Sequence, residues 1–204
     1  IFSRMLHNSV NVMKRQREEH YIKEYPLYSH DDIDTLMEHV HPLMYNTPKV
    51  LRKHGEELEM TLYPAGHAVG AAGIELVYKH RHIFFTGDVL FTQQSILNGA
   101  RFPKHSLDTL VMETTRGATE VDPYYNRNEE VRSLLETVNN TLKGGGSVLI
   151  PVFAFGRMQE IMNLLQQARL RGDIPITPVI SSGLGMELAE YIDKITKRTE
   201  LCTF

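Results

Sequence analysis

The spacing of apolar residues changes along this chain, and that change limits its fold more than any other feature. Residues 3–24 lack Gly and Pro and carry apolar side chains at helical intervals, which predicts a helix. A second helix is expected to begin after Ser29, a candidate N-cap with Asp32 three positions on, and to run to about Pro42. From residue 56 onward the apolar spacing becomes two, which is typical of strands.

Short strands and then alternating helices and strands are expected in the rest of the chain. The segments ELEMTLY, GIELVYKH, HIFFTGD and DTLVMET predict four strands, and a glycine-rich loop separates the first two. Later, SVLIPVFAF and ITPVISS read as buried strands between helical stretches, which predicts a parallel sheet with crossover helices. The expected fold class is therefore α/β, with a boundary that divides the chain into residues 1–117 and 118–204.

Composition excludes some classes of function. The chain has 204 residues, of which 42% are hydrophobic and 23% charged, and these values are ordinary for a globular protein. No apolar run approaches the length of a membrane span, and the single cysteine, Cys202, excludes an internal disulfide, so a cytoplasmic protein is expected. With a net charge of −3, the chain does not have the excess of basic residues that is usual in proteins that bind duplex nucleic acid. A metal site can supply the positive charge that the composition lacks.

A histidine in a glycine-rich loop and an aspartate after the next strand are the main candidates for chemistry. His67 lies in AGHAVGAAG, where glycines let the backbone approach a ligand closely. Asp88 follows IFFTG, at the carboxyl end of a buried strand, where α/β proteins place functional groups. A buried carboxylate needs a partner or a metal, so both residues are candidate metal ligands. The alternative is a loop histidine that is hydrogen-bonded to a structural aspartate.

Glu113 adds a second carboxylate to this set. It ends the next predicted strand, in LVMETTRG, and is expected on the same rim as His67. Carboxylates gathered at one rim suit a divalent metal or the orientation of a catalytic histidine. The alternative is a glutamate that stabilises a turn.

Two His-x-His pairs also have the spacing that metal sites use, but both are expected at the surface. His39 and His41 lie near a predicted helix end, where residues two apart point in different directions. His80 and His82 fall in a basic segment, KHRH, which reads as a solvated hairpin turn. Neither pair is therefore taken as a ligand set.

The order of these segments resembles the β-CASP branch of the metallo-β-lactamase superfamily. The stretches AGHAVGAAGIEL, IFFTGD, LVMETTRG and GGSVLIPVFAFGRMQEI carry the resemblance. That branch includes RNA 3′-end cleavage endonucleases and the ribonuclease J group. The resemblance implies part of an αββα sandwich in residues 1–117, followed by the first part of a Rossmann-like β-CASP domain in residues 118–204.

The resemblance also implies a role for individual residues. His67 would match a zinc-ligating histidine, and Asp88 would match the aspartate that bridges two zinc ions. Glu113 would match a glutamate that positions a later histidine, so Asp88 and Glu113 are the candidate catalytic residues. Arg157, in PVFAFGRMQE, and Ser182, in ISSGLG, are candidate contacts to the substrate.

The chain departs from the family pattern at several points. Arg116 stands where members usually carry tyrosine, and ISSGLG lacks the usual aspartate and proline. The His-x-His-x-Asp-His motif, which supplies most of the metal ligands, is expected upstream of Ile1, and two late histidines are expected beyond Phe204. We therefore expect an internal fragment that is inactive by itself.

The function implied by the resemblance is a zinc-dependent hydrolase that cleaves RNA phosphodiester bonds as an endonuclease or exonuclease. Two zinc ions are the expected cofactors, and single-stranded RNA is the expected partner, with a homodimer or a processing complex as a further expectation. The alternatives are a non-catalytic scaffold subunit of the same fold and a DNA-directed nuclease of the superfamily. The three rim residues favour an enzyme, because a scaffold has no chemical need for them.

Overall fold

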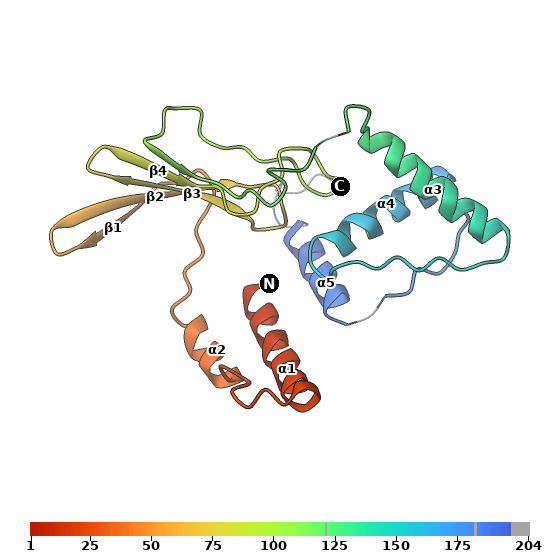
Figure 1. Cartoon of the computed structure of the whole chain (residues 1–204), viewed down its shortest axis with the longest axis horizontal. Helices are drawn as coiled ribbons and strands as arrows, with labels where there is room; N and C mark the ends of the chain where they lie inside the picture. The colour runs from red at the N-terminus through yellow and green to blue at the C-terminus, as the bar shows by residue number, and fades with distance from the viewer. Residues whose placement is uncertain (121, 182, 197–204) are drawn as a thin grey trace. The chain divides into compact units, whose positions relative to one another are not determined.

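The computed structural model of the protein describes residues 1–120, 122–181 and 183–196. Five helices and one five-stranded sheet are found in these residues (Figure 1), so the predicted mixed α/β class is confirmed. The chain forms two compact units, residues 1–43 and residues 44–204. None of the helices in the described ranges has both the length and the apolar character needed to cross a membrane.

The first unit consists of two helices that share a small apolar core. Helix α1 spans Phe2–His20 and helix α2 spans His30–Met37. Val10 and Met13 of α1 pack with Ile33 of α2, and all three side chains are buried. The predicted helical spacing therefore places the apolar stripe of α1 against α2, as burial of one face requires.

Local sequence explains where these two helices begin and end. The Ser29 hydroxyl accepts a hydrogen bond from the Asp32 N–H at 3.1 Å, and the Asp32 carboxylate accepts from the Ser29 N–H at 2.7 Å. This capping box confirms the predicted start of α2. The helix α1 ends earlier than expected because Tyr21 adopts a left-handed backbone with φ of 55°. The helix α2 also ends before Pro42, at Met37.

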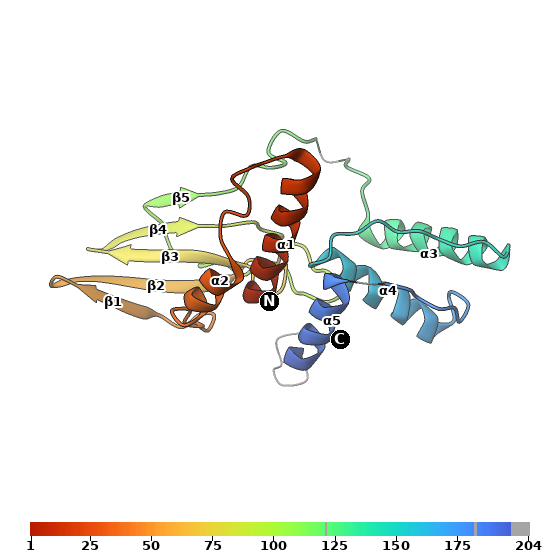
Figure 2. The same cartoon turned by 90° about the horizontal axis from the view of Figure 1, so that it is seen from below.

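The second unit is built on a sheet with the strand order β1-β2-β3-β4-β5, which Figure 2 shows side by side. The strands are β1 (Lys49–Lys53), β2 (Glu56–Pro64), β3 (Ala72–Tyr78), β4 (Arg81–Phe85) and β5 (Thr109–Val111). The first four pair antiparallel with their neighbours in the chain, and β5 pairs parallel with β4. The four predicted strands are thus confirmed, with β1 in addition.

Strand β1 was not predicted, because KVLRK has no clear alternation of apolar and polar residues. A local signal for it exists in the following turn, where His54 and Gly55 both have positive φ, at 50° and 79°. Two positive φ values are required in the commonest two-residue hairpin turn. The strand lies at the sheet edge, and its Arg52 pairs with Glu57 at 2.6 Å. Charged side chains of this kind protect an edge strand from further pairing.

Aromatic side chains form the core between the sheet and the connection made by residues 86–108. Phe84 of β4 is buried, and its ring contacts Phe102 edge to face at a centroid distance of 4.7 Å. Tyr63 of β2 meets the same ring at 5.9 Å. A side chain on Gly73 would collide with the Phe84 ring, so the glycine in β3 makes room for it. The long connection is therefore anchored on the sheet through Phe102.

Three helices follow the sheet: α3 (Arg127–Lys143), α4 (Arg157–Arg171) and α5 (Leu184–Thr196). The apolar faces of α3 and α4, together with a residue shortly after α4, supply a second core. It consists of Leu135, Val138, Leu165, Ala168 and Ile174. The helical stretches expected in this part of the chain are therefore confirmed.

The parallel strands predicted in this region are not formed. Of the described residues after 118, none lies in a strand, and residues 147–153 and 175–181 have no strand beside them. Leu149 and Ile180 are 92% and 91% exposed, although a sheet would bury them. A parallel strand takes its hydrogen bonds from strands that are distant in the chain, and the described residues place no such strand alongside these segments. The boundary at residues 117 and 118 stays a prediction.

Candidate functional site

Backbone pairing brings together the two loops that carry His67 and Asp88. Gly66 and Val89 form an isolated antiparallel bridge. Because His67 directly follows Gly66 and Asp88 directly precedes Val89, the bridge places both residues at the same end of the sheet. The sequence predicted this proximity, and the structure provides its cause.

Gly66 is required at this crossing. Its φ is +70°, and a Cβ atom there would lie 2.6 Å from the backbone nitrogen of Ala100 and would also collide with the carbonyl oxygen of Leu90. The Leu90 N–H donates to the Ala65 carbonyl at 2.9 Å, which holds the two loops in this close approach. Only a residue without a side chain fits such a position.

The His67 and Asp88 side chains are both exposed, rather than buried against each other. Within the described ranges, no hydrogen bond joins them, so the alternative of a histidine bonded to a structural aspartate is not what the structure shows. Both side chains are therefore open to a ligand from solvent.

Glu113 holds the loop that follows Asp88. Its carboxylate accepts a hydrogen bond from the Val89 N–H at 2.6 Å, and its own N–H donates to the Thr86 hydroxyl at 3.2 Å. The hydrogen bonds from the Val89 N–H and from Thr115 hold the pKa of the Glu113 carboxyl below its ordinary value, and the charge of His67 contributes. Glu113 thus stabilises the turn, as one of the two interpretations predicted. Its role toward a catalytic histidine stays a prediction.

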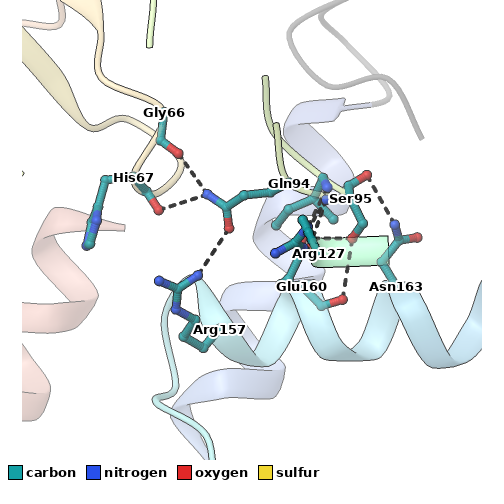
Figure 3. Close-up of polar contacts among 9 residues, drawn as sticks. Gly66, His67, Gln94, Ser95, Arg127, Arg157, Glu160 and Asn163 are labelled. Atoms are coloured by element: carbon teal, nitrogen blue, oxygen red, sulfur yellow. Dashed lines mark hydrogen bonds and ion pairs between the residues drawn. The ribbon is translucent and has the colours of Figure 1, made fainter. Parts of the chain in front are cut away.

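Gln94 links the His67 loop to helix α4 (Figure 3). Its buried side chain donates to the carbonyl oxygens of Gly66 at 2.7 Å and of His67 at 3.2 Å, and it accepts from Arg157 at 3.5 Å. Arg157, at the first position of α4, is exposed. Ser182, the other predicted substrate contact, lies outside the described residues.

A buried carboxylate on α4 reinforces this link. Glu160 accepts hydrogen bonds from the Ser95 N–H at 2.9 Å and the Ser95 hydroxyl at 2.7 Å, and it forms an ion pair with Arg127 of α3 (Figure 3). A buried charge is tolerated when it is paired and hydrogen-bonded in this way. Sequence analysis missed Glu160 and Gln94, although Glu160 lies within the quoted PVFAFGRMQE segment.

The residues at the loop crossing meet only part of the requirement of a zinc site. Imidazole and carboxylate are donors that zinc uses, but a zinc ion is held by three or four protein ligands. His67 and Asp88 supply two such donors, and they belong to no group of three or more close donors in the described part of the chain. The crossing therefore offers two candidate donors for a metal and not a complete coordination shell.

Sequence analysis also missed a second polar cluster, on the sheet itself. His82 was expected in a solvated turn, but it lies in β4, where the register pairs it with Val77. Its ring nitrogen is 2.8 Å from the buried Glu75 carboxylate of β3, because the two side chains are diagonal neighbours on one face. His105 reaches the same carboxylate at 2.6 Å. The partner His80 is exposed, as predicted.

The cluster changes the ionisation of its members. Burial raises the pKa of the Glu75 carboxyl, but hydrogen bonds from His82, His105 and Tyr63 outweigh burial and hold that pKa below its ordinary value. Burial, with a contribution from Glu75, raises the pKa of the Tyr63 phenol to about 12. Tyr63 therefore remains a hydrogen-bond donor, at 2.9 Å from Glu75, over the whole physiological range.

Comparison with known proteins finds a family and several relatives that match this chain. Residues 5–116 match the metallo-beta-lactamase superfamily domain. A transcription termination factor, FttA, of Pyrococcus horikoshii is 38% identical over 157 residues, which cover 74% of this chain and 23% of that protein.

Two further relatives are named as RNA-directed enzymes or as similar to them. The endoribonuclease YSH1 of Kluyveromyces lactis is 33% identical over 141 residues, which cover 69% of this chain and 18% of that protein. An RNase J-like protein of Methanocaldococcus jannaschii is 34% identical over 154 residues, which cover 73% of this chain and 35% of that protein. The chain thus spans roughly a fifth to a third of the length of these relatives.

Proposed function

This chain belongs to the metallo-β-lactamase superfamily, and we propose that it is part of a metal-dependent hydrolase that cleaves RNA phosphodiester bonds. The superfamily fold implies a divalent metal, and two zinc ions are our proposal for its identity and number. The names of the two relatives just described, an endoribonuclease and an RNase J-like protein, support RNA as the substrate. Both the activity and the substrate of the whole protein are inferences from these relatives.

The observation that carries the proposal is the Gly66–Val89 bridge, which brings an exposed imidazole and an exposed carboxylate to one end of the sheet. His67 and Asp88 would hold metal there, together with ligands from outside the described residues. When bound there, zinc would supply the Lewis-acid chemistry that phosphodiester hydrolysis requires. The Glu113 carboxylate keeps the Asp88 loop in place through its hydrogen bond to Val89.

Arg157 is our candidate for the contact to the RNA backbone. Its guanidinium is exposed at the start of α4, and Gln94 joins it to the carbonyl oxygens of the His67 loop. Arginine recognises phosphate through charge-assisted hydrogen bonds, so a single strand that crosses the end of the sheet could place a phosphate between Arg157 and His67. Ser182 remains a second candidate for substrate contact.

Location and assembly are part of the same proposal. We propose a reducing compartment such as the cytoplasm, because the chain carries a single cysteine. An assembly with a second copy or with a processing complex stays a prediction.

The second candidate function is a non-catalytic scaffold of the same fold. It is favoured by the incomplete ligand set, since His67 and Asp88 supply only two donors among the described residues. A scaffold would keep the loop crossing for its stability rather than for a metal.

The test is cleavage of labelled single-stranded RNA by the full-length protein and by its Asp88→Asn variant. We expect the variant to lose cleavage and to retain the unfolding curve of the wild type, because Asp88 is exposed. Asp31→Asn, which alters an exposed aspartate on α2, is the matched control and should cleave normally.

Three results would contradict the proposal. Normal cleavage by Asp88→Asn would remove this residue from the reaction. A wild-type protein that cleaves a DNA strand of the same sequence in preference to RNA would favour the DNA-directed nuclease, and one that cleaves neither would favour the scaffold.

A further inference from the structure

We propose that Glu75, His82 and His105 form a second metal site, which binds a divalent transition metal such as Zn²⁺ on the face of the sheet. The three donors lie on β3, on β4 and in the connection of residues 86–108. None of them belongs to the loop crossing at His67 and Asp88. The inference therefore stands independently of the proposed RNA hydrolysis.

The donor atoms have the composition and proximity of a zinc site. One oxygen of Glu75, one nitrogen of His82 and one nitrogen of His105 lie within 4.8 Å of one another. No other group of three close donors is found across residues 1–120, 122–181 and 183–196. Two histidines and one carboxylate are a ligand set that zinc uses when its fourth position is left to water.

The charge of the cluster also favours a cation. The Glu75 side chain is only 4% exposed, and a carboxylate that is buried to this extent requires a charge partner or strong hydrogen bonds. Within the described ranges, the ion pairs of Glu75 are those with His82 and His105. A divalent cation held by the two imidazoles would supply a full opposite charge.

Two neighbouring residues hold the donors in place. The Tyr63 hydroxyl donates to one Glu75 oxygen at 2.9 Å, which leaves the other oxygen facing both histidines. Asp108 accepts from the His82 N–H at 2.7 Å and donates its own N–H to the His82 carbonyl at 2.9 Å. The Tyr63 hydrogen bond orients the Glu75 carboxylate. The Asp108 hydrogen bonds fasten the chain shortly after His105 to β4. Supporting hydrogen bonds of this kind are usual around metal ligands.

Metal binding would require a small adjustment of the cluster. The two histidine nitrogens now lie 2.8 and 2.6 Å from the Glu75 oxygen, as hydrogen-bonded atoms do. Tetrahedral zinc with bonds of about 2.0–2.1 Å holds its donors about 3.4 Å apart. Each histidine nitrogen must therefore move about 0.7 Å away from the Glu75 oxygen. The side chains of His82 and His105 are 35% and 47% exposed and can move outward by this amount. Solvent then reaches the fourth position.

The expected consequence of binding is a tighter connection between the strands and the long loop. The metal would join β3 and β4 to the end of residues 86–108, the segment that also carries Asp88 and Gln94. A ligand that binds only the folded chain stabilises it, so zinc should raise the unfolding temperature of the protein.

The test is equilibrium dialysis of the 204-residue chain against zinc chloride, with metal quantified in the protein. We use the double variant His67→Ala and Asp88→Asn as the background, so that the loop crossing contributes nothing. One zinc ion per chain should remain bound. Adding His105→Gln should then weaken zinc binding by at least about 10- to 100-fold, the loss caused by removing even a supporting residue.

Two further variants separate the metal site from a purely hydrogen-bonded cluster. His80→Gln, in the exposed turn before β4, is the matched control and should leave zinc affinity unchanged. Tyr63→Phe should weaken zinc binding by about 10-fold, because it removes a supporting hydrogen bond. Cobalt(II) supplies a second readout, since His-ligated cobalt has visible absorption bands that His105→Gln should change.

The proposal is wrong if the background variant binds no zinc, or if His105→Gln binds it as tightly as the background does. Because His105 lies in a half-exposed loop position, its replacement should not unfold the chain, and circular dichroism checks this. RNA cleavage enters none of these measurements. Failure to bind zinc at the Glu75 cluster would therefore leave the proposed RNA hydrolysis unaffected. Failure to cleave RNA would likewise leave the proposed zinc site unaffected.

Discussion

Backbone pairing between strands differs between two regions of the molecule, the sheet of residues 44–113 and the helical region of residues 127–196. In the sheet, each of the first four strands pairs with the next strand in the chain. In the helical region, the apolar segments 147–153 and 175–181 have no strand beside them within the described residues. Antiparallel hairpins find their partners locally, whereas parallel strands need partners from distant parts of a chain. The difference shows that, in the described residues, strand pairing is confined to the region where partners are near in the chain.

Buried polar groups connect the two regions. Glu160 of α4 binds the backbone and hydroxyl of Ser95 and pairs with Arg127 of α3. Gln94 connects Arg157 with the His67 loop. Single substitutions can test how much these buried hydrogen bonds contribute to the link between the regions.

The largest expected contrast between the two regions is in amide hydrogen exchange. Amides in β2 and β3 should exchange orders of magnitude more slowly than those in residues 147–153 and 175–181, because only the strands are held by a ladder. Mass spectrometry of peptides from the exchanged protein measures both in one experiment. Equal protection in the two regions would show that the later segments are paired after all.

A matched pair of phenylalanine substitutions gives the next largest effect. Phe84→Ala should lower the free energy of unfolding by about 3–5 kcal/mol, because the ring is buried against Phe102. Phe153→Ala, at a side chain that is 83% exposed, should change it by no more than about 0.5 kcal/mol. Urea denaturation measures both. A large loss from Phe153→Ala would contradict the difference in packing between the regions.

The polar link should break when Glu160 loses its charge partner. Arg127→Met should cost about 3 kcal/mol, near the lower end for a broken buried pair, because Arg127 is partly exposed. Arg132→Met, which removes an exposed partner of Glu136 on the same helix, should cost at most about 1 kcal/mol. Similar losses from the two variants in urea denaturation would mean that Glu160 does not depend on Arg127.

A smaller effect is expected in the first unit, where a helix start depends on neighbouring residues alone. Ser29→Ala removes the cap of α2 and should cost about 1 kcal/mol of the stability of this unit. Ser29→Thr keeps a hydroxyl and should retain most of that stability. Circular dichroism during thermal unfolding compares the two variants. Equal losses would show that the capping hydroxyl is not what stabilises α2.

The smallest effect is the pH dependence of the same cap. Hydrogen bonds from the Ser29 N–H and hydroxyl hold the pKa of the Asp32 carboxyl below its ordinary value. A lowered pKa in the folded state means that this stabilisation is fully present above the pKa of the unfolded chain. It is lost as the pH falls through the folded pKa. Carboxyl NMR titration should show the lowered pKa, and Ser29→Ala should raise it. An Asp32 pKa that is unchanged by this substitution would contradict the assignment.

Most of the local structure could be predicted from the sequence. The helical spacing before residue 24, the Ser29 cap and the period-two strands all follow from residues that are close in the chain, and the structure confirms them. The proximity of His67 and Asp88 was predictable because each stands beside the end of a recognisable strand. Short-range patterns of this kind indicate local structure directly when the hydrogen-bonding partners are also near in the chain.

Tertiary contacts decided the rest, because the residues involved are far apart in the chain. Glu75 and His105 are separated by 30 positions, and Ser95 and Glu160 by 65, so no local pattern indicates that they meet. The same reason explains the unpaired segments, whose apolar sequence predicts a strand without specifying a partner. Local sequence therefore determined the helices, the hairpins and the loop crossing. The Glu75 cluster and the link through Glu160 exist because folding brings distant hydrogen-bonding groups together.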